Sequence, residues 1–305
     1  MKTTEAHSPS LDCIVLIPIH HLKWTSIELA AISRCLQVLS SHDIVIAHPD
    51  SISPEEIKLS IRLELDNISL AFLALPSHCL SSVSSYNKLL LDPKFYDRLQ
   101  RWQYLLIVQL DAWLLSGCLD PWLKAGYSYI GAPWPPFMGP DKTNSCYGVG
   151  NGGLSLRRLD HVYRLLQSWR FRLYPVYTPQ EMVGRLFHST NTQNTNFTPT
   201  LLNQLKRLAL CAFSLFGFRN NLAYFVTMGY HEDHLYGLLA PRVAPWFKVA
   251  PPEAAAAFAI EAKPQDVLAY FGVDVPFGCH AWERHDSAFY LSRFSDEFAS
   301  LSSSS

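Results

Sequence analysis

The chain has 305 residues, of which 49% are hydrophobic and 17% are charged. This composition is typical of a globular protein and excludes a disordered chain, and the length is sufficient for one large α/β domain or two small ones. The formal net charge of −1 gives no general attraction to nucleic acid or to an anionic membrane, so we expect no nucleic-acid partner.

The seven cysteines are scattered and form no C-x-x-C pair. Such a set predicts reduced thiols in a cytoplasmic protein, and not a disulfide framework or a structural zinc site. Residues 1–11 are polar and lack the apolar core of a signal peptide. No apolar run has the ~18 to 20 residues that cross a membrane. Residues 201–218 fit either a buried helix or an amphipathic surface helix, so peripheral contact at the inner face of a membrane is the most we expect.

Apolar runs and helical patterns alternate through the first part of the chain. Buried strands are expected at residues 12–19, 43–47, 68–73 and 104–110. Helical patterns lie between them at residues 24–39, from Ser53-Pro54-Glu55-Glu56 onward, and at 81–102 with a division at Asp92-Pro93. This alternation predicts an α/β fold with a mostly parallel central sheet flanked by helices. The glycine fingerprints of dinucleotide-binding and P-loop proteins are absent.

The later part of the chain predicts a different arrangement. Strands are expected at residues 127–132 and 255–260, a glycine-rich bend at 148–153 and a helix at 159–169. Residues 174–221 break the alternation and predict a helical insertion or lid, which is a possible acceptor region. We expect one domain over residues 11–290, with flexible tails at 1–10 and 296–305.

The stretch Tyr104–Asp111 is an apolar run that ends in Gln109 and Asp111. Ligands bind at the carboxyl ends of the strands in open α/β sheets. A carboxylate at such an end is a hard oxygen ligand, suited to Mg²⁺ or Mn²⁺ carrying a diphosphate. The alternative is that Asp111 only caps the following turn.

Several other polar and aromatic residues allow two interpretations each. The bend at residues 148–153 permits close backbone approach to a ligand, but it could be an ordinary hairpin loop. Glu232 and Asp233 could be catalytic acids or only first-turn acids of a solvated helix. His231 and His234 have the spacing of metal ligands, but no third ligand lies near them in the sequence.

Arg157 could pair with a phosphate or cap its strand. Trp134 could line a sugar site or belong to the core, and His280 could be a metal ligand or a surface histidine.

Taken in order, these segments resemble the GT-A-type glycosyltransferases, and more closely the domain-of-unknown-function 5672 (DUF5672) family. The matching segments are Ser85–Leu90, Gln109–Ala112, Tyr129–Trp134, Gly150–Arg157, Glu232–Asp233 and Phe277–His280. The resemblance implies a single GT-A-like (Rossmann-like) domain that covers most of the chain.

The resemblance also implies roles for individual residues. Asp111 matches the metal-binding acid of a D-x-D motif whose first acid is replaced here by Gln109, and His280 matches the histidine that completes the metal shell. Asp233, in the pair Glu232–Asp233, matches the general base of inverting members. The remaining expected donor-site residues are His20 at the nucleotide base, Gly152 and Gly153 at the sugars, Arg157 and Trp134.

The implied activity is that of a hexosyltransferase-like enzyme in polysaccharide biosynthesis. It would move a sugar from a nucleotide-sugar donor, with a UDP-sugar as the first candidate, to a saccharide or lipid-linked acceptor, with Mn²⁺ or Mg²⁺ as cofactor. Two alternatives stay open. Gln109 in place of an acid also fits a catalytically inactive nucleotide-sugar-binding module, and residues 174–221 could make the chain an interaction protein.

Overall fold

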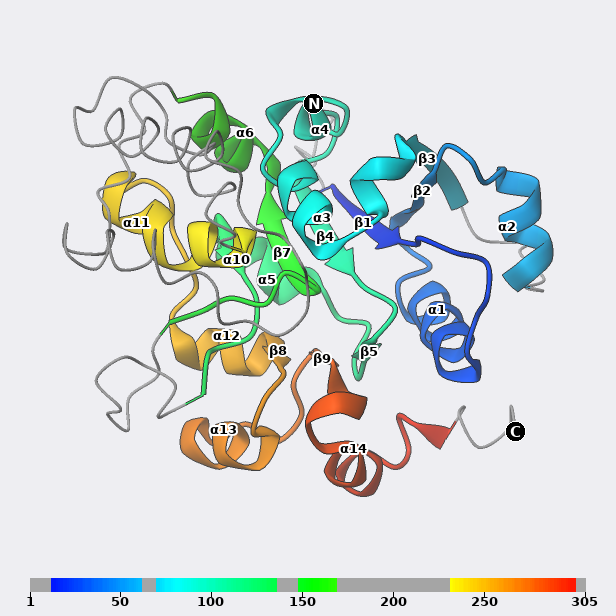
Figure 1. The fold of residues 1–305 in the computed structure, drawn as a ribbon. Coiled ribbons are helices and arrows are strands. Elements are labelled where there is room, and N and C mark those ends of the chain that lie inside the picture. The colour runs from blue at the N-terminus through cyan, green and yellow to red at the C-terminus, as the bar shows by residue number, and fades with distance from the viewer. Residues whose placement is uncertain (1–11, 62–69, 136–147, 169–230, 300–305) are drawn as a thin grey trace, which may run out of the picture.

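The structure is a computed structural model that describes residues 12–61, 70–135, 148–168 and 231–299 (Figure 1). The expected insertion at 174–221, the helix at 201–218 and the tail at 1–10 lie outside the described residues. Among the described residues, no helix is long and apolar enough to span a bilayer. The described cysteines, Cys13, Cys35, Cys79, Cys118 and Cys279, are all free thiols.

A six-stranded central sheet forms the body of the described chain, in the order β3-β2-β1-β4-β7-β6. Its strands are β1 (Cys13–Pro18), β2 (Asp43–Pro49), β3 (Leu70–Leu75), β4 (Tyr104–Val108), β6 (Tyr129–Ile130) and β7 (Leu154–Arg158). The first four run parallel, whereas β7 is antiparallel to both β4 and β6. The predicted mostly parallel sheet is therefore confirmed.

Both faces of the sheet are buried, which explains why its strands are apolar runs and not alternating ones. Ile14 and Leu16 of β1 belong to one hydrophobic cluster, and Val15 and Ile17 belong to another. One cluster is closed by α3 (Val83–Leu89), α4 (Pro93–Asp97) and α6 (Leu159–Gln167). The other is closed by α1 (Ser26–Val38), α2 (Pro54–Ile61) and α5 (Asp120–Ala125).

Local signals in the sequence set the starts of the first helices. The hydroxyl of Thr25 accepts a hydrogen bond from the backbone N–H of Glu28, and the carboxylate of Glu28 accepts one from the backbone N–H of Thr25, which is a capping box. Ser53 and Glu56 make the same reciprocal pair before α2. Both predicted helix starts are confirmed.

A second, three-stranded sheet in the order β5-β9-β8 was not predicted. It consists of β5 (Ala112–Leu114), β9 (Gly278–His280) and β8 (Ala259–Ile260). The helices α12 (Pro252–Phe258), α13 (Pro264–Phe271) and α14 (Trp282–Arg293) accompany it in the lower part of Figure 1. The remaining segments are η1 (Ser77–Leu80), α10 (Glu232–His234), a π-helical turn η2 (Leu235–Leu239) and α11 (Ala240–Val243).

The strand expected at 255–260 is wrong over most of its length, because α12 continues to Phe258 and only Ala259–Ile260 is a strand. Four consecutive alanines after a proline in the first turn favour a helix more strongly than an apolar run favours a strand.

The expected tail at 296–305 also begins too early. Phe298 is 2% exposed, and its ring stacks on Trp113 with the ring centroids 4.7 Å apart. Trp282 packs edge-on against the same phenylalanine. Residues up to Phe298 therefore belong to the folded domain. The missed signal is the i, i+4 spacing of Phe294 and Phe298, whose rings are both buried in the turn that follows α14 and whose backbones are joined by a hydrogen bond from the N–H of Phe298 to the carbonyl of Phe294.

We predict that Phe298→Ala lowers the free energy of unfolding by about 3 to 5 kcal/mol, because it leaves a cavity beside Trp113. Urea titration would measure the loss. The control is Leu59→Ala, at a leucine that is 80% exposed. Equal midpoints for the two variants would show that residue 298 does not pack in the core.

Candidate functional site

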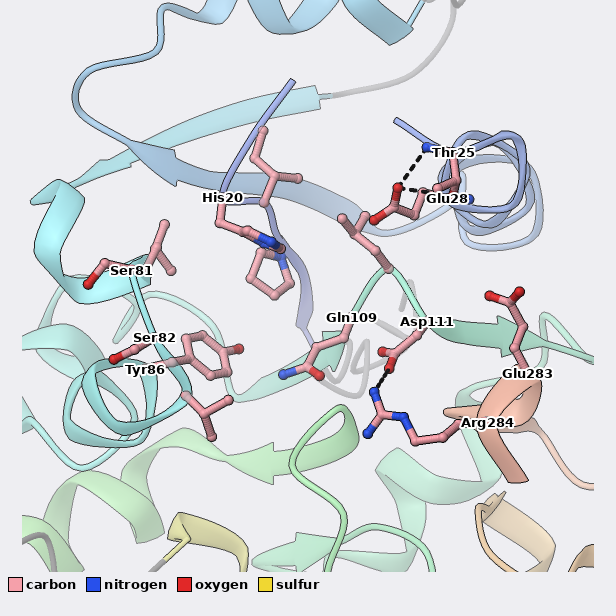
Figure 2. Close-up of a pocket in the computed structure, with 15 residues that line it drawn as sticks. His20, Thr25, Glu28, Ser81, Ser82, Tyr86, Gln109, Asp111, Glu283 and Arg284 are labelled. Carbon is pink, nitrogen blue, oxygen red and sulfur yellow. Dashed lines mark hydrogen bonds and ion pairs between the residues drawn. The ribbon is translucent and has the colours of Figure 1, made fainter. Parts of the chain in front are cut away.

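A cavity of about 560 Å³ opens at the carboxyl ends of β1 and β4 (Figure 2). Its polar lining comprises His20, Thr25, Glu28, Ser81, Ser82, Tyr86, Gln109, Asp111, Glu283 and Arg284. In Figure 2, Ser81, Ser82 and Tyr86 lie on one side, and Asp111, Glu283 and Arg284 lie on the other. The cavity thus lies at the sheet edge where the chain order predicts ligand binding.

Three of the expected donor-site residues meet at this edge. The Nε2 atom of His280 lies 3.1 Å from Oδ1 of Asp111 and 3.3 Å from Oε1 of Gln109. The small sheet brings them together, because Ala112 of β5 pairs with His280 of β9. The guanidinium of Arg284 adds a second cation, 3.8 Å from Oδ2 of Asp111. Asp111 therefore does more than cap a turn.

The charges of these groups depend on one another. Burial by itself would lower the pKa of His280, but the hydrogen bonds to Asp111 and Glu261 outweigh it and raise that pKa from 6.5 to about 9. For Asp111, burial would raise the pKa, but the contact with His280 lowers it below its usual value. Asp111 and His280 therefore form an ion pair at neutral pH.

The donor atoms around His280 fit a divalent cation. Among the described residues, no three His, Cys, Asp or Glu side chains converge as a complete metal site. The amide oxygen of Gln109 supplies a third donor beside the carboxylate of Asp111 and the imidazole of His280. Oxygen donors suit Mg²⁺ and Mn²⁺, which keep several positions for water or phosphate oxygens. Binding of the cation requires that His280 lose the proton on Nε2.

The glycine-rich bend at residues 148–153 lies against His280 at Gly153 and against Glu232 at Gly152. A side chain at Gly153 would overlap the imidazole of His280, and one at Gly152 would overlap the carboxylate of Glu232. The positive φ of 68° in this bend falls on Asn151 and not on a glycine. The side-chain oxygen of Asn151 accepts hydrogen bonds from the backbone N–H groups of Gly153 and Leu154, which closes the turn.

Arg157 and Glu232 form a buried ion pair, with 2.8 Å between Nη2 and Oε1 and side chains 0% and 6% exposed. Arg157 also donates to the hydroxyl of Tyr96. Burial raises the pKa of Glu232, and Arg157 opposes that shift. The expectations that Arg157 holds a phosphate and that Glu232 is catalytic do not fit this geometry. Each buried charge here needs the other as its partner.

Asp233 is the second residue of α10, and it contacts the glycine-rich bend at Asn151. Its Oδ2 atom accepts a hydrogen bond of 3.0 Å from the N–H of Asn151, and Oδ1 accepts one of 2.8 Å from the N–H of His234. Asp233 is half-buried and is not among the residues that line the cavity. The bend therefore has His280 against Gly153 and Asp233 against Asn151.

Trp134 and His20 take different positions. The ring of Trp134 lies close to Gly148 and Gly150 and 5.2 Å from the ring of His234, so it forms a wall between the bend and α10. His20 lines the cavity at its exposed rim, and partial desolvation of the imidazole together with the neighbouring His21 lowers its pKa. The roles of Trp134 and His20 toward a ligand stay predictions.

Sequence reasoning missed Glu261, Glu283, Arg284 and Tyr86. Glu261 follows β8 and contacts Nδ1 of His280 at 3.0 Å. It ends the apolar run at 255–260 just as Asp111 ends the run at 104–110, and that signal could have identified it. Glu283 and Arg284 lie in the first turn of α14 and have no comparable pattern.

The raised pKa of His280 predicts a pH-dependent stability. The stabilisation is present in full below pH 6.5 and is lost as the pH rises through about 9, because the folded state holds the proton more tightly. The loss is on the order of 3 kcal/mol. Unfolding measured in EDTA should show a steeper decline with pH for the wild type than for His280→Gln. His285→Gln, at an exposed histidine, is the control. Parallel curves for wild type and His280→Gln would contradict the ion pair.

Residues 69–280 match the family described as "Protein of unknown function (DUF5672)". The match covers more than two thirds of the 305 residues, so the chain belongs to this family. The predicted family is confirmed. A comparison with curated proteins gave no match.

The fold is also similar to solved glycosyltransferases. One is the galactosyltransferase LgtC in complex with donor and acceptor sugar analogues, at 13% identity and a TM-score of 0.49, covering 95% of this chain and 96% of that one. Another is core-mannan synthase A from Aspergillus fumigatus in a Mn/GDP form, at 9% identity and a TM-score of 0.35, covering 52% and 62%. A third is the mannosyltransferase Ktr4p from S. cerevisiae in complex with GDP, at 10% identity and a TM-score of 0.36, covering 53% and 59%. This chain therefore spans about three fifths of the last two proteins, and no activity follows from these distant likenesses.

Proposed function

We propose that this protein is a GT-A-type glycosyltransferase that moves a sugar from a nucleotide-sugar donor to a hydroxyl group of a saccharide or lipid-linked acceptor. The observation that carries the proposal is the cavity at the strand ends, where Asp111 and Gln109 line the wall and contact His280. Its volume of about 560 Å³ is within the range of small-molecule sites.

The donor diphosphate would lie beside Asp111, with Arg284 as a positive charge at the same wall. Asp111, His280 and Gln109 would hold the Mn²⁺ or Mg²⁺ ion. When bound, such an ion neutralises charge on the departing diphosphate. The nucleoside, with uridine as the first candidate, would extend toward His20, Ser82 and Tyr86 on the other side of the cavity (Figure 2).

Asp233 is the proposed general base of an inverting reaction. The acceptor oxygen attacks the anomeric carbon, its proton passes to the Asp233 carboxylate, and the bond from the anomeric carbon to the diphosphate oxygen breaks. The half-buried position of Asp233 beside the glycine-rich bend supports this role. Each carboxylate oxygen has a second lone pair left after its hydrogen bond to the backbone. Glu232 has no part in proton transfer in this proposal.

A catalytically inactive nucleotide-sugar-binding module is the second candidate. It is favoured by Gln109 in place of an acid, and by the backbone hydrogen bonds that engage both oxygens of Asp233. The two candidates differ in nucleotide release and not in donor binding. For either one, the free thiols of the described residues fit a reducing compartment such as the cytoplasm.

A panel of UDP-, GDP- and dTDP-sugars with Mn²⁺ tests the function. We expect one donor to raise the melting temperature, since a ligand at 100 times its dissociation constant adds about 2.7 kcal/mol of stability. The same donor should release its nucleotide slowly even without an acceptor. Asp111→Asn should abolish both effects, whereas Asp120→Asn, at a side chain 67% exposed, should not. Binding without release across the panel would favour the inactive module.

Asp233→Asn should reduce the rate of transfer by about 10²- to 10⁴-fold while donor binding stays within twofold, because only proton transfer is lost. The rate would be measured with saturating donor and acceptor. Asp160→Asn changes another first-turn acid, in α6, and serves as the matched control. Equal rates for Asp233→Asn and the wild type would restrict Asp233 to its contacts with the backbone.

A further inference from the structure

We infer that Glu261 is a positioning residue that holds the imidazole of His280 with Nε2 facing Asp111 and Gln109. Three side chains form a line, with Oε1 of Glu261 3.0 Å from Nδ1 of His280 and Oδ1 of Asp111 3.1 Å from Nε2. The inference rests on the proposed function, because the group that His280 would serve is the cation of the donor site.

The small sheet fixes this line through its register. Ile260 of β8 pairs with Cys279 of β9 in parallel register, so Glu261, the residue directly after β8, comes beside His280 of β9. On the other side of β9, Ala112 pairs with His280, which puts Asp111 beside the opposite edge of the imidazole. The strand pairing thus places one carboxylate on each side of the ring.

The contacts around Glu261 and His280 leave the imidazole of His280 little room to rotate. The backbone oxygen of Glu261 accepts a hydrogen bond of 2.9 Å from the hydroxyl of Tyr290, which is fully buried. The imidazole lies directly against Gly153, where even a methyl group would overlap it. The His280 side chain is 13% exposed. A rotated ring would therefore lose its partners without gaining contact with water.

A histidine whose Nδ1–H donates to a carboxylate presents Nε2 as the ligand atom. Loss of such a partner costs metal-binding histidines about 10- to 100-fold in affinity. Glu261 would not touch the cation or the substrate. It would act only through the tautomer and the orientation of His280.

The first test is the affinity for Mn²⁺, measured by electron paramagnetic resonance of free Mn²⁺ without nucleotide. We expect Glu261→Ala to weaken binding about 10- to 100-fold. Glu261→Gln keeps an acceptor oxygen and should recover most of the loss. Glu253→Ala removes an exposed carboxylate from α12 and should have no effect, which controls for overall charge. His280→Ala should abolish binding. Wild-type affinity in Glu261→Ala, with loss in His280→Ala, would overturn the inference.

The second test needs no metal. Proton NMR of the histidine-labelled apoprotein should show an imidazole Nδ1–H resonance that is protected from exchange, absent in His280→Ala, and lost in Glu261→Ala. Retention of this resonance in Glu261→Ala would also overturn the inference. If the resonance is lost in Glu261→Ala but the wild type binds no Mn²⁺, Glu261 still orients His280. The cation would then have to be removed from the proposed function. The tests thereby distinguish a failure of the Glu261 inference from a failure of the proposed cation site.

Discussion

The buried ion pair between Arg157 and Glu232 is the interaction on which the candidate site depends. It joins β7, in the antiparallel part of the central sheet, to α10, and the hydroxyl of Tyr96 completes its hydrogen bonding. Removal of one partner from such a pair costs about 3 to 5 kcal/mol, because the other charge stays buried and uncompensated. Glu232 also packs on Gly152, so the pair fixes the glycine-rich bend and, through it, the neighbours of that bend.

The glycine-rich bend lies between the small sheet, which carries His280, and α10, which carries Asp233. The small sheet delivers His280 to Gly153, and α10 delivers Asp233 to Asn151. The central sheet contributes Asp111 from the end of β4. In the proposed mechanism, Asp111 and His280 serve the departing diphosphate, whereas Asp233 takes the proton of the acceptor. The few atoms of Gly152 and Gly153 keep the two parts close together.

The sequence predicts those features that depend on local patterns. The four parallel strands, the starts of α1 and α2 and the place of Asp111 at a strand end were predicted from runs of neighbouring residues. The small sheet was not, because its strands have two or three residues each and gain their register only from distant pairing. Arg157 and Glu232 lie 75 residues apart in the chain, so no spacing rule reveals that each neutralises the other. A match to a family motif shows that a residue belongs to the pattern, but not whether it faces the cavity or the core.

The stack of Phe298 on Trp113 links the end of the described chain to its middle. Trp113 is part of β5, two residues from Asp111, and β5 pairs with β9. The last strand of the central sheet, β7, ends at Arg158. During synthesis, this sheet can therefore fold on the ribosome well before β9 and Phe298 emerge from the exit tunnel. The central sheet would therefore stand without the small sheet that brings His280 to Asp111 until the segment from β9 to Phe298 has been made. Pairing of β5 with β9 is thus the folding step that completes the candidate site.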